Sequence, residues 1–389
     1  MIGSDWSSDV CSSDLGIPAI VGAGEKADEI ADGDLLLIDG AAGEVVAQPD
    51  EQTLADFAER QKADAAHRAM LAQYKDKEGA TSDGRRVIIE GNIGTPDDAV
   101  RVAELGGEGV GLFRSEFLFM DRTDLPSEEE QFAAYKKACE IMQGKPVIIR
   151  TLDIGGDKEV PALALEKEQN PFLGYRAIRI CLNQPELFLI QLRALLRAAQ
   201  YGDLRIMFPM ISSVDEVRGA KQVLEQAKDM LTAEGVPFNP NVKVGIMVEI
   251  PVAAVCADVL AKEVDFFSIG TNDLIQYSCA VDRINEKISY LYRPLHPGVL
   301  RLIAMTAKAA NENGIEVGVC GEMAGTAGMA PVLCGLGVTN LSMSASAMLA
   351  AKADLAKHSC GECKELADKL LACASASDAE RIFADWRES

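Results

Sequence analysis

Two short apolar runs, each passing directly into polar residues, decide the fold: VGIMVEIP at residues 244–251 and DFFSIGTNDL at residues 265–274. Similar runs recur from Arg85 onward and alternate with helical stretches such as 97–105, 185–200, 214–234 and 297–313. Runs of this length are typical of buried strands. The strand candidates are Val87–Gly91, Gly109–Phe113, Val147–Thr151, Arg205–Phe208, Val244–Glu249, Asp265–Ile269, Glu316–Val319 and Asn340–Met343.

Eight strands with helical crossovers indicate an α/β protein with a (β/α)8 TIM barrel, a fold that takes about 250 residues. An open doubly wound sheet is the alternative. That fold opens its first helix with G-x-G-x-x-G when it binds a dinucleotide, and no such motif follows the first strand candidate. We therefore predict a barrel over residues 85–389.

The residues before the barrel divide into three segments. Residues 1–15, MIGSDWSSDVCSSDL, repeat SSD without helix or strand periodicity, and we treat them as a non-native or disordered opening. Residues 16–49 combine short apolar runs with DG turns, which predicts strands but too few residues for a core of their own. Residues 50–84 begin with an alanine-rich stretch without Gly or Pro, which predicts a connecting helix.

The composition excludes several classes of function. The chain has 38 Lys and Arg against 60 Asp and Glu, a net charge of -22, which disfavours binding to nucleic acid or to anionic membranes. Its ten cysteines are scattered, which favours reduced thiols in a cytoplasmic protein. The sequence shows neither a signal-peptide pattern nor an apolar run of transmembrane length.

Ionisable residues follow the strand candidates, at the end of a barrel where active sites lie. Any one of them could be a salt-bridged surface residue, but their convergence favours a site. Two arginines suit carboxylate and phosphate groups, two carboxylates suit magnesium, and a thiol at the barrel mouth could move a proton. These residues are Arg114, Arg150, Glu249, Asp273 and Cys320, with Asn272 beside them. They predict a pocket for a small phosphorylated carboxylic acid and metal-assisted phosphoryl transfer.

Seven motifs in order resemble the phosphoenolpyruvate–protein phosphotransferases, enzyme I of the bacterial sugar phosphotransferase system. The resemblance covers the chain from about residue 16 to its C-terminus. GTNDL alone would be shared with pyruvate phosphate dikinase and phosphoenolpyruvate synthase, whose ATP-binding domains have no counterpart here. The motifs are GVGLFRSEFLFMDR (109–122), RTLDIGGDK (150–158), NPFLGYRAIR (170–179), VEIPVAA (248–254), DFFSIGTNDLIQY (265–277), AVDR (280–283) and CGEMAG (320–325).

The resemblance implies substrate-binding residues. Arg114 and Arg150 would bind the phosphate and carboxylate of phosphoenolpyruvate, and Arg283 would be a third phosphate ligand. Asn272 and the backbone of Asp273 would also contact the substrate.

The resemblance also implies a metal site and an acid. Glu249 and Asp273 would coordinate Mg²⁺, and Cys320 would protonate C3 of the enolate to give pyruvate. Arg176 and Lys158 would support phosphate binding or loop order.

The family is phosphorylated on a histidine in a swivelling domain, upstream of a stretch like GIPAIVG at residues 16–22. His67, His296 and His358 do not lie in such a motif, so we expect residues 16–49 to be the C-terminal remnant of that domain. The resemblance implies a homodimer formed through the barrel and a histidine-containing phosphocarrier protein as partner of the full-length parent. A non-catalytic phosphoenolpyruvate-binding and dimerisation fragment, a dikinase or synthase relative, and a lyase acting on pyruvate-type enolates remain alternatives.

Overall fold

A computed structural model describes residues 2–3, 20–21, 30–40, 42–120, 122–156, 160–163 and 165–388 of the chain. The expectation for Lys158, and most of that for the opening segment, fall outside these residues. The chain divides into two compact units, Met1–Asp76 and Lys77–Ser389. Each unit is described by itself.

The first unit contains two small sheets and one long helix. The helix begins at Asp50, whose side chain accepts a hydrogen bond from the Thr53 amide at 2.8 Å, a typical N-cap. None of the residues of this helix is buried. The described elements of the first unit are the parallel pair β1 (Ile2–Gly3) and β2 (Ile20–Val21), the antiparallel pair β3 (Leu36–Asp39) and β4 (Glu44–Ala47), and helix α2 (Glu51–Ala72).

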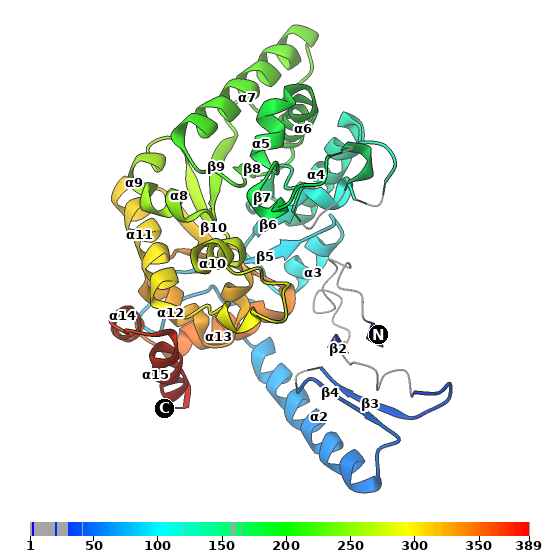
Figure 1. Ribbon diagram of the computed structural model, residues 1–389, viewed down its shortest axis with the longest axis vertical. Coiled ribbons are helices and arrows are strands. Elements are labelled where there is room, and N and C mark those ends of the chain that lie inside the picture. Colours follow the sequence, from blue (N-terminus) through cyan, green and yellow to red (C-terminus); the bar gives the residue numbers. More distant parts are fainter. Residues whose placement is uncertain are drawn as a thin grey trace. The chain divides into compact units, whose positions relative to one another are not determined.

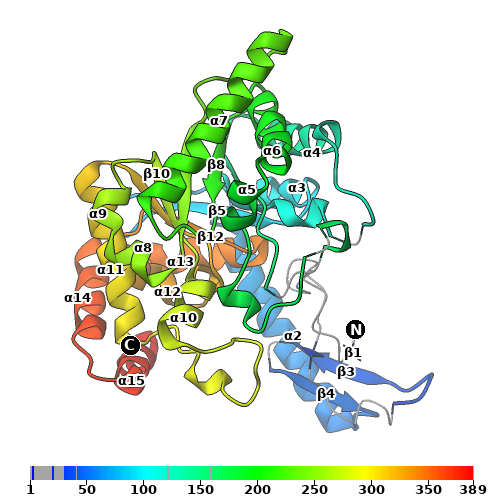
Figure 2. The same cartoon turned by 45° about the horizontal axis from the view of Figure 1, so that its top comes forward.

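The second unit is a closed barrel of eight parallel strands, which confirms the predicted (β/α)8 fold. Figure 1 shows the strands at the centre of this unit and the helices outside them, and the turned view in Figure 2 agrees. In chain order the strands are β5 (Ile88–Ile93), β6 (Val110–Arg114), β7 (Val147–Arg150), β8 (Leu204–Phe208), β9 (Lys243–Val248), β10 (Phe266–Ile269), β11 (Glu316–Val319) and β12 (Asn340–Met343).

The longer helices start and stop at local signals. Ser213 and Glu216 form a capping box at the start of α7, and Gly235 ends that helix in the left-handed conformation. The helices of this unit are α3 (Asp98–Glu104), α4 (Glu128–Met142), α5 (Ile178–Asn183), α6 (Pro185–Ala198), α7 (Val214–Glu234), α8 (Pro251–Val255), α9 (Ala257–Leu260), α10 (Thr271–Cys279), α11 (Pro297–Asn313), α12 (Met329–Gly335), α13 (Met348–Lys357), α14 (Cys360–Leu371) and α15 (Ala376–Glu388).

Successive side chains of a strand point to opposite faces of the barrel wall, so the apolar residues form two clusters, one between strands and helices and one inside the barrel. On β7, Ile149 belongs to the large core cluster that includes residues of the surrounding helices, whereas Ile148 faces the barrel interior. The interior cluster consists of Leu112, Ile148, Met207, Met247, Phe266 and Cys320. These six side chains form an apolar layer inside the barrel.

A close approach of α12 to α14 provides the first testable prediction. A methyl group on Gly335 would overlap the carbonyl oxygen of Cys363, so Gly335→Ala should lower the free energy of unfolding by about 1–3 kcal/mol. Gly361→Ala on α14 is the matched control. The nearest atom to its added methyl would be 3.9 Å away, and alanine favours helix by up to about 1 kcal/mol. Urea unfolding that gives equal stabilities for the two variants would contradict this packing.

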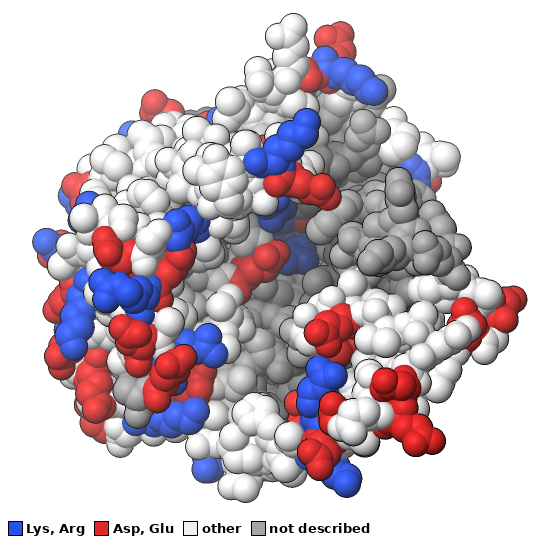
Figure 3. All heavy atoms as spheres, turned by 60° about the horizontal axis from the view of Figure 1, so that its bottom comes forward, with Lys and Arg blue, Asp and Glu red and all other residues white. Residues whose placement is uncertain are grey.

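The surface mixes both charge signs. On the face drawn in Figure 3, the described Lys and Arg side chains are interspersed with Asp and Glu. Within the described ranges, no helix has the length and apolar character needed to cross a bilayer.

Candidate functional site

Ion pairs among buried residues mark the C-terminal ends of the strands. Arg150, the last residue of β7, pairs with Glu116 and, at 2.8 Å from Nη1 to Oδ2, with Asp153. Arg176 Nη2 lies 3.0 Å from Asp153 Oδ1 and 3.3 Å from Asp273 Oδ2. Each of these five residues is at least nine-tenths buried. The loops that follow β6, β7 and β10 are thus tied together by alternating charges.

Glu249 follows β9 directly and lies close to this ion-pair group. Its Oε1 accepts a hydrogen bond at 2.6 Å from the amide of Met210, which has a φ of +57°, uncommon for a residue other than glycine. Burial, followed by the negative charges of Asp273 and Asp153, raises the pKa of Glu249 to about 8. Without a cation, the Glu249 carboxyl therefore keeps its proton at neutral pH.

Several buried donors at this site are available to a ligand. Within the described part of the chain, Arg150 Nε, Arg176 Nε and Gln276 Nε2 have no hydrogen-bond partner. Leaving a buried donor unpaired costs about 1–3 kcal/mol, so such groups are normally satisfied by protein, water or ligand. Two guanidinium groups with unused N–H bonds suit an anion that carries carboxylate or phosphate oxygens.

The acidic residues fit a magnesium ion. Among the described residues no group of three or more His, Cys, Asp or Glu side chains is arranged to hold a metal. Mg²⁺ does not need such a cage, because it is commonly held by one or two carboxylates, several waters and substrate phosphates. Glu249 and Asp273 supply two carboxylates, and the proton affinity of Glu249 indicates a place where positive charge would be favourable.

The other predicted ligands differ in their recorded contacts. Arg114 is half-buried and is the register partner of Arg150 on the neighbouring strand. Asn272 pairs with Glu322, its Nδ2 lying 3.1 Å from Oε1 while its Oδ1 accepts from the Glu322 amide at 3.0 Å. Arg283 follows α10, and its backbone amide donates to Gln276 Oε1 at 3.0 Å. The structure thus brings Arg114 beside Arg150, whereas the recorded contacts of Asn272 and of the Arg283 backbone are with other residues.

The sequence predicted the Cys320 thiol at the barrel mouth and not in the core, whereas the structure places it in the apolar interior of the barrel. Its side chain is only 3% exposed and belongs to the interior apolar cluster, because the residue continues the inward-facing positions of β11. Its Sγ lies 3.8 Å from the carbonyl oxygen of Ile269, and the neighbouring Ser268 side chain favours the ionised form of the thiol. Burial raises the pKa of Cys320 to about 11, so the thiol is protonated at neutral pH.

Sequence reasoning missed the carboxylates that hold the arginines. Glu116 lies two residues after Arg114, and Asp153 lies three after Arg150, so both were inside motifs already singled out. The sequence pattern that could have predicted these ion-pair partners is an Asp or Glu within three residues of an arginine at the end of a strand. Their buried pairing with Arg150 nonetheless depends on which strands become neighbours.

Comparison with protein families shows the general class of protein to which the chain belongs. Residues 68–360 match the family described as PEP-utilising enzyme, PEP-binding domain, where PEP is phosphoenolpyruvate. This match covers nearly the whole barrel, including the ion-pair group and Glu249. The barrel and its site are therefore those of a phosphoenolpyruvate-utilising enzyme.

Individual relatives narrow the class. Proteins named phosphoenolpyruvate-protein phosphotransferase are 50% identical over 97% of this chain in Priestia megaterium, 47% over 100% in Staphylococcus carnosus and 49% over 100% in Bacillus subtilis. The chain covers 66%, 68% and 67% of these relatives, about two thirds of their length. The chain belongs to the phosphoenolpyruvate–protein phosphotransferase family.

Proposed function

We propose that this chain binds phosphoenolpyruvate and Mg²⁺ and releases pyruvate as the phosphoryl group passes to a histidine of a separate domain, the first step of the sugar phosphotransferase system. The observation that carries the proposal is the buried Arg150, whose Nε has no hydrogen-bond partner among the described residues, in one group with Arg176, Glu249 and Asp273. This group of neighbouring buried residues offers donors for an anion and oxygens for a cation.

Each residue has a proposed role. Arg114 and Arg150 bind the phosphate and carboxylate and fix the substrate for in-line transfer, since phosphoryl transfer depends mainly on positioning and charge. Arg283 and Asn272 contribute further contacts. When bound, Mg²⁺ on Glu249 and Asp273 neutralises charge on the transferring phosphoryl group.

The reaction leaves an enolate that needs a proton. As the bond from phosphorus to the substrate oxygen breaks, a bond to the acceptor histidine nitrogen forms. The Cys320 S–H then gives its proton to C3 of the enolate, which yields pyruvate and a thiolate. The high pKa of Cys320 supports this role, because the thiol enters the reaction protonated.

The proposal also covers the cellular location of the chain, its oligomeric state and its protein partner. We propose a cytoplasmic location, which is supported by free thiols at all nine cysteines within the described residues. We also propose a homodimer formed through the barrel and a histidine-containing phosphocarrier protein that receives the phosphoryl group in the full-length parent.

A reconstituted assay tests the function. The chain would be mixed with Mg²⁺, phosphoenolpyruvate and the N-terminal part of the Bacillus subtilis relative as phosphoryl acceptor. We expect pyruvate release only when all components are present. Pyruvate release without the acceptor would favour a lyase, and tight substrate binding with no release in the complete mixture would indicate a binding module.

Because the pKa of Glu249 is raised, Mg²⁺ binding at this residue should be coupled to the release of a proton. Because a cation favours the ionised carboxylate, Mg²⁺ binding at pH 7 should release close to one proton, and the release should fall as the pH rises past 8. Calorimetry in buffers of different ionisation enthalpy measures this number. Glu249→Gln should lose both the proton release and most of the Mg²⁺ affinity, whereas Glu104→Gln at an exposed position should keep both. Equal proton release in the two variants would remove Glu249 from the metal site.

A further inference from the structure

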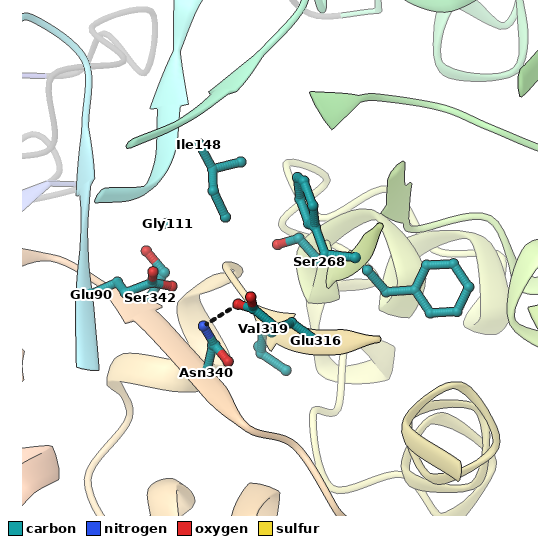
Figure 4. A pocket seen from close by; sticks show the side chains of 11 residues that line it. Glu90, Gly111, Ile148, Ser268, Glu316, Val319, Asn340 and Ser342 are labelled. Atoms are coloured by element: carbon teal, nitrogen blue, oxygen red, sulfur yellow. Dashed lines mark hydrogen bonds between the residues drawn. The ribbon is translucent and has the colours of Figure 1, made fainter. Parts of the chain in front are cut away.

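A small pocket lies inside the barrel, lined by residues of strands β5, β6, β7, β10, β11 and β12. Figure 4 shows Glu90, Ser268, Asn340 and Ser342 around it, contributed by strands β5, β10 and β12. Its volume is about 10 Å³, close to the space that one water molecule needs. The alternating pattern of these strands points polar side chains inward, where a barrel is more often filled by apolar residues.

Glu90 is the residue that needs an explanation. It is 2% exposed, and its Oε1 has no hydrogen-bond partner among the residues that the structure describes. Gly111 leaves room for it, because a methyl group there would lie 2.7 Å from Glu90 Oε2. Glu90 is thus a buried carboxyl group that lines a pocket of this size, which is an environment in which an ordered water binds.

The charged groups around Glu90 lie near the N-terminal ends of the strands. Arg205 favours the ionised form of Glu90, and Glu316 and Glu108 oppose it. Burial is the largest influence and raises the pKa of Glu90 to about 7, so the residue can both hold and release a proton near neutral pH. Glu316 also lines the pocket, and its side chain is 39% exposed, which connects the pocket to solvent.

Ser268 joins this pocket to the thiol. Its side chain lines the pocket, and its register partner on β11 is Gly318, which lies two residues before Cys320 and on the same face of that strand. The Ser268 side chain also favours the ionised form of Cys320. The remaining members of the interior cluster around Cys320 are apolar, namely Leu112, Ile148, Met207, Met247 and Phe266. Ser268 is therefore a polar side chain through which a proton can reach the thiol from the pocket.

We propose that Glu90, a pocket water and Ser268 form a proton path that restores the Cys320 thiol from the N-terminal side of the barrel. In this path the Ser268 hydroxyl gives its proton to the thiolate and takes one from the water. The water takes one from the Glu90 carboxyl group, which regains its proton from solvent past Glu316. Each transfer breaks one bond to hydrogen and forms another, so no other reactant is consumed.

The catalytic meaning of this path rests on the proposed function, in which Cys320 protonates the enolate. The path itself does not, because a thiol exchanges its hydrogen with solvent without any substrate. The proposal therefore predicts how fast the Cys320 S–H becomes S–D in D2O, a rate that infrared spectroscopy of the S–H stretch measures in the free chain. The band that disappears in Cys320→Ala is the Cys320 band.

We expect Glu90→Gln and Ser268→Ala to slow this exchange by about 100-fold, the lower end of what a positioned proton-transfer group contributes. Glutamine keeps the shape of Glu90 but cannot release a proton to the water. Glu186→Gln removes a carboxylate from an exposed position on α6 and should exchange like the unmodified chain. Glu90→Asp keeps an acid in the pocket and should recover exchange relative to Glu90→Gln, which a purely structural role would not predict.

Exchange of Cys320 at the unmodified rate in Glu90→Gln would overturn the proposal, as would equal rates in Glu90→Gln and Glu90→Asp. Both outcomes are measured on the thiol without substrate, so neither depends on whether the variants form pyruvate. If exchange slows as expected but Cys320→Ala still gives stereochemically pure labelled pyruvate, the proton path stands and the assignment of Cys320 as the acid fails.

Discussion

Replacing Arg150 with methionine should lower the free energy of unfolding by about 3–5 kcal/mol. The substitution removes the cation between two buried carboxylates, Glu116 and Asp153, whose side chains are each 1% exposed. Removing one partner of a buried ion pair leaves an uncompensated charge in a medium that solvates it poorly. Urea unfolding at pH 7, followed by circular dichroism, measures the change.

An exposed arginine provides the control. Arg101 pairs with Glu104 at 3.8 Å on α3, where both side chains are 61% exposed. Such a pair contributes at most about 0.5 kcal/mol, so Arg101→Met should unfold like the unmodified chain. A loss below about 1 kcal/mol in Arg150→Met would mean that the buried carboxylates take up protons or find another cation.

Replacing Cys320 with alanine should slow protonation of the enolate by about 100- to 10,000-fold, the usual contribution of a positioned general acid. Affinity for phosphoenolpyruvate should stay near the unmodified value, because the thiol is buried among apolar residues beneath the site. With an acceptor domain supplied, phosphoryl transfer should continue while enolpyruvate takes its proton from water.

The stereochemistry of the product tests this prediction. Phosphoenolpyruvate with deuterium at one of its two C3 positions, converted in tritiated water, gives a methyl group that carries all three hydrogen isotopes. The configuration of that methyl group distinguishes a proton delivered to one face from a proton taken up at either face in solution. Cys334→Ala serves as the control, since Cys334 is equally buried but lies on α12, outside the barrel interior. Stereochemically pure pyruvate from Cys320→Ala would mean that another group is the acid.

Local signals explain why much of the fold could be predicted from the sequence. Helices α7 and α11 have the predicted bounds because each is followed by a glycine in the left-handed conformation, Gly235 and Gly314. Strand β5 differs, since it starts at Ile88 and continues to Ile93 through a register shift after Gly91. In the sequence, a glycine such as Gly91 indicates the end of a strand. The strand continues beyond Gly91 because it pairs with a neighbouring strand, and that pairing depends on residues distant in sequence.

The site was predicted less completely than the fold. Arg150, Glu249 and Asp273 could be found because an ionisable residue after an apolar strand stands out. Their charge partners depend on closure of the barrel, and so does the burial of Cys320, which the sequence placed at the mouth. Glu90 sits within a strand candidate and looks like an ordinary alternating polar position, although the barrel buries it completely enough to raise its pKa.

We propose that the arginines at the strand ends bind phosphoenolpyruvate together with Mg²⁺. Titration calorimetry of phosphoenolpyruvate into the chain and into Arg114→Met, with Mg²⁺ and with chelator, measures this binding. Arg114 is half-buried, and its replacement leaves the ion pairs of Arg150 in place. We expect Mg²⁺-dependent binding to the chain and a loss of about 2 kcal/mol, or about 30-fold, in the variant. Equal affinities for the two proteins, or no binding to the unmodified chain with Mg²⁺, would contradict the claim.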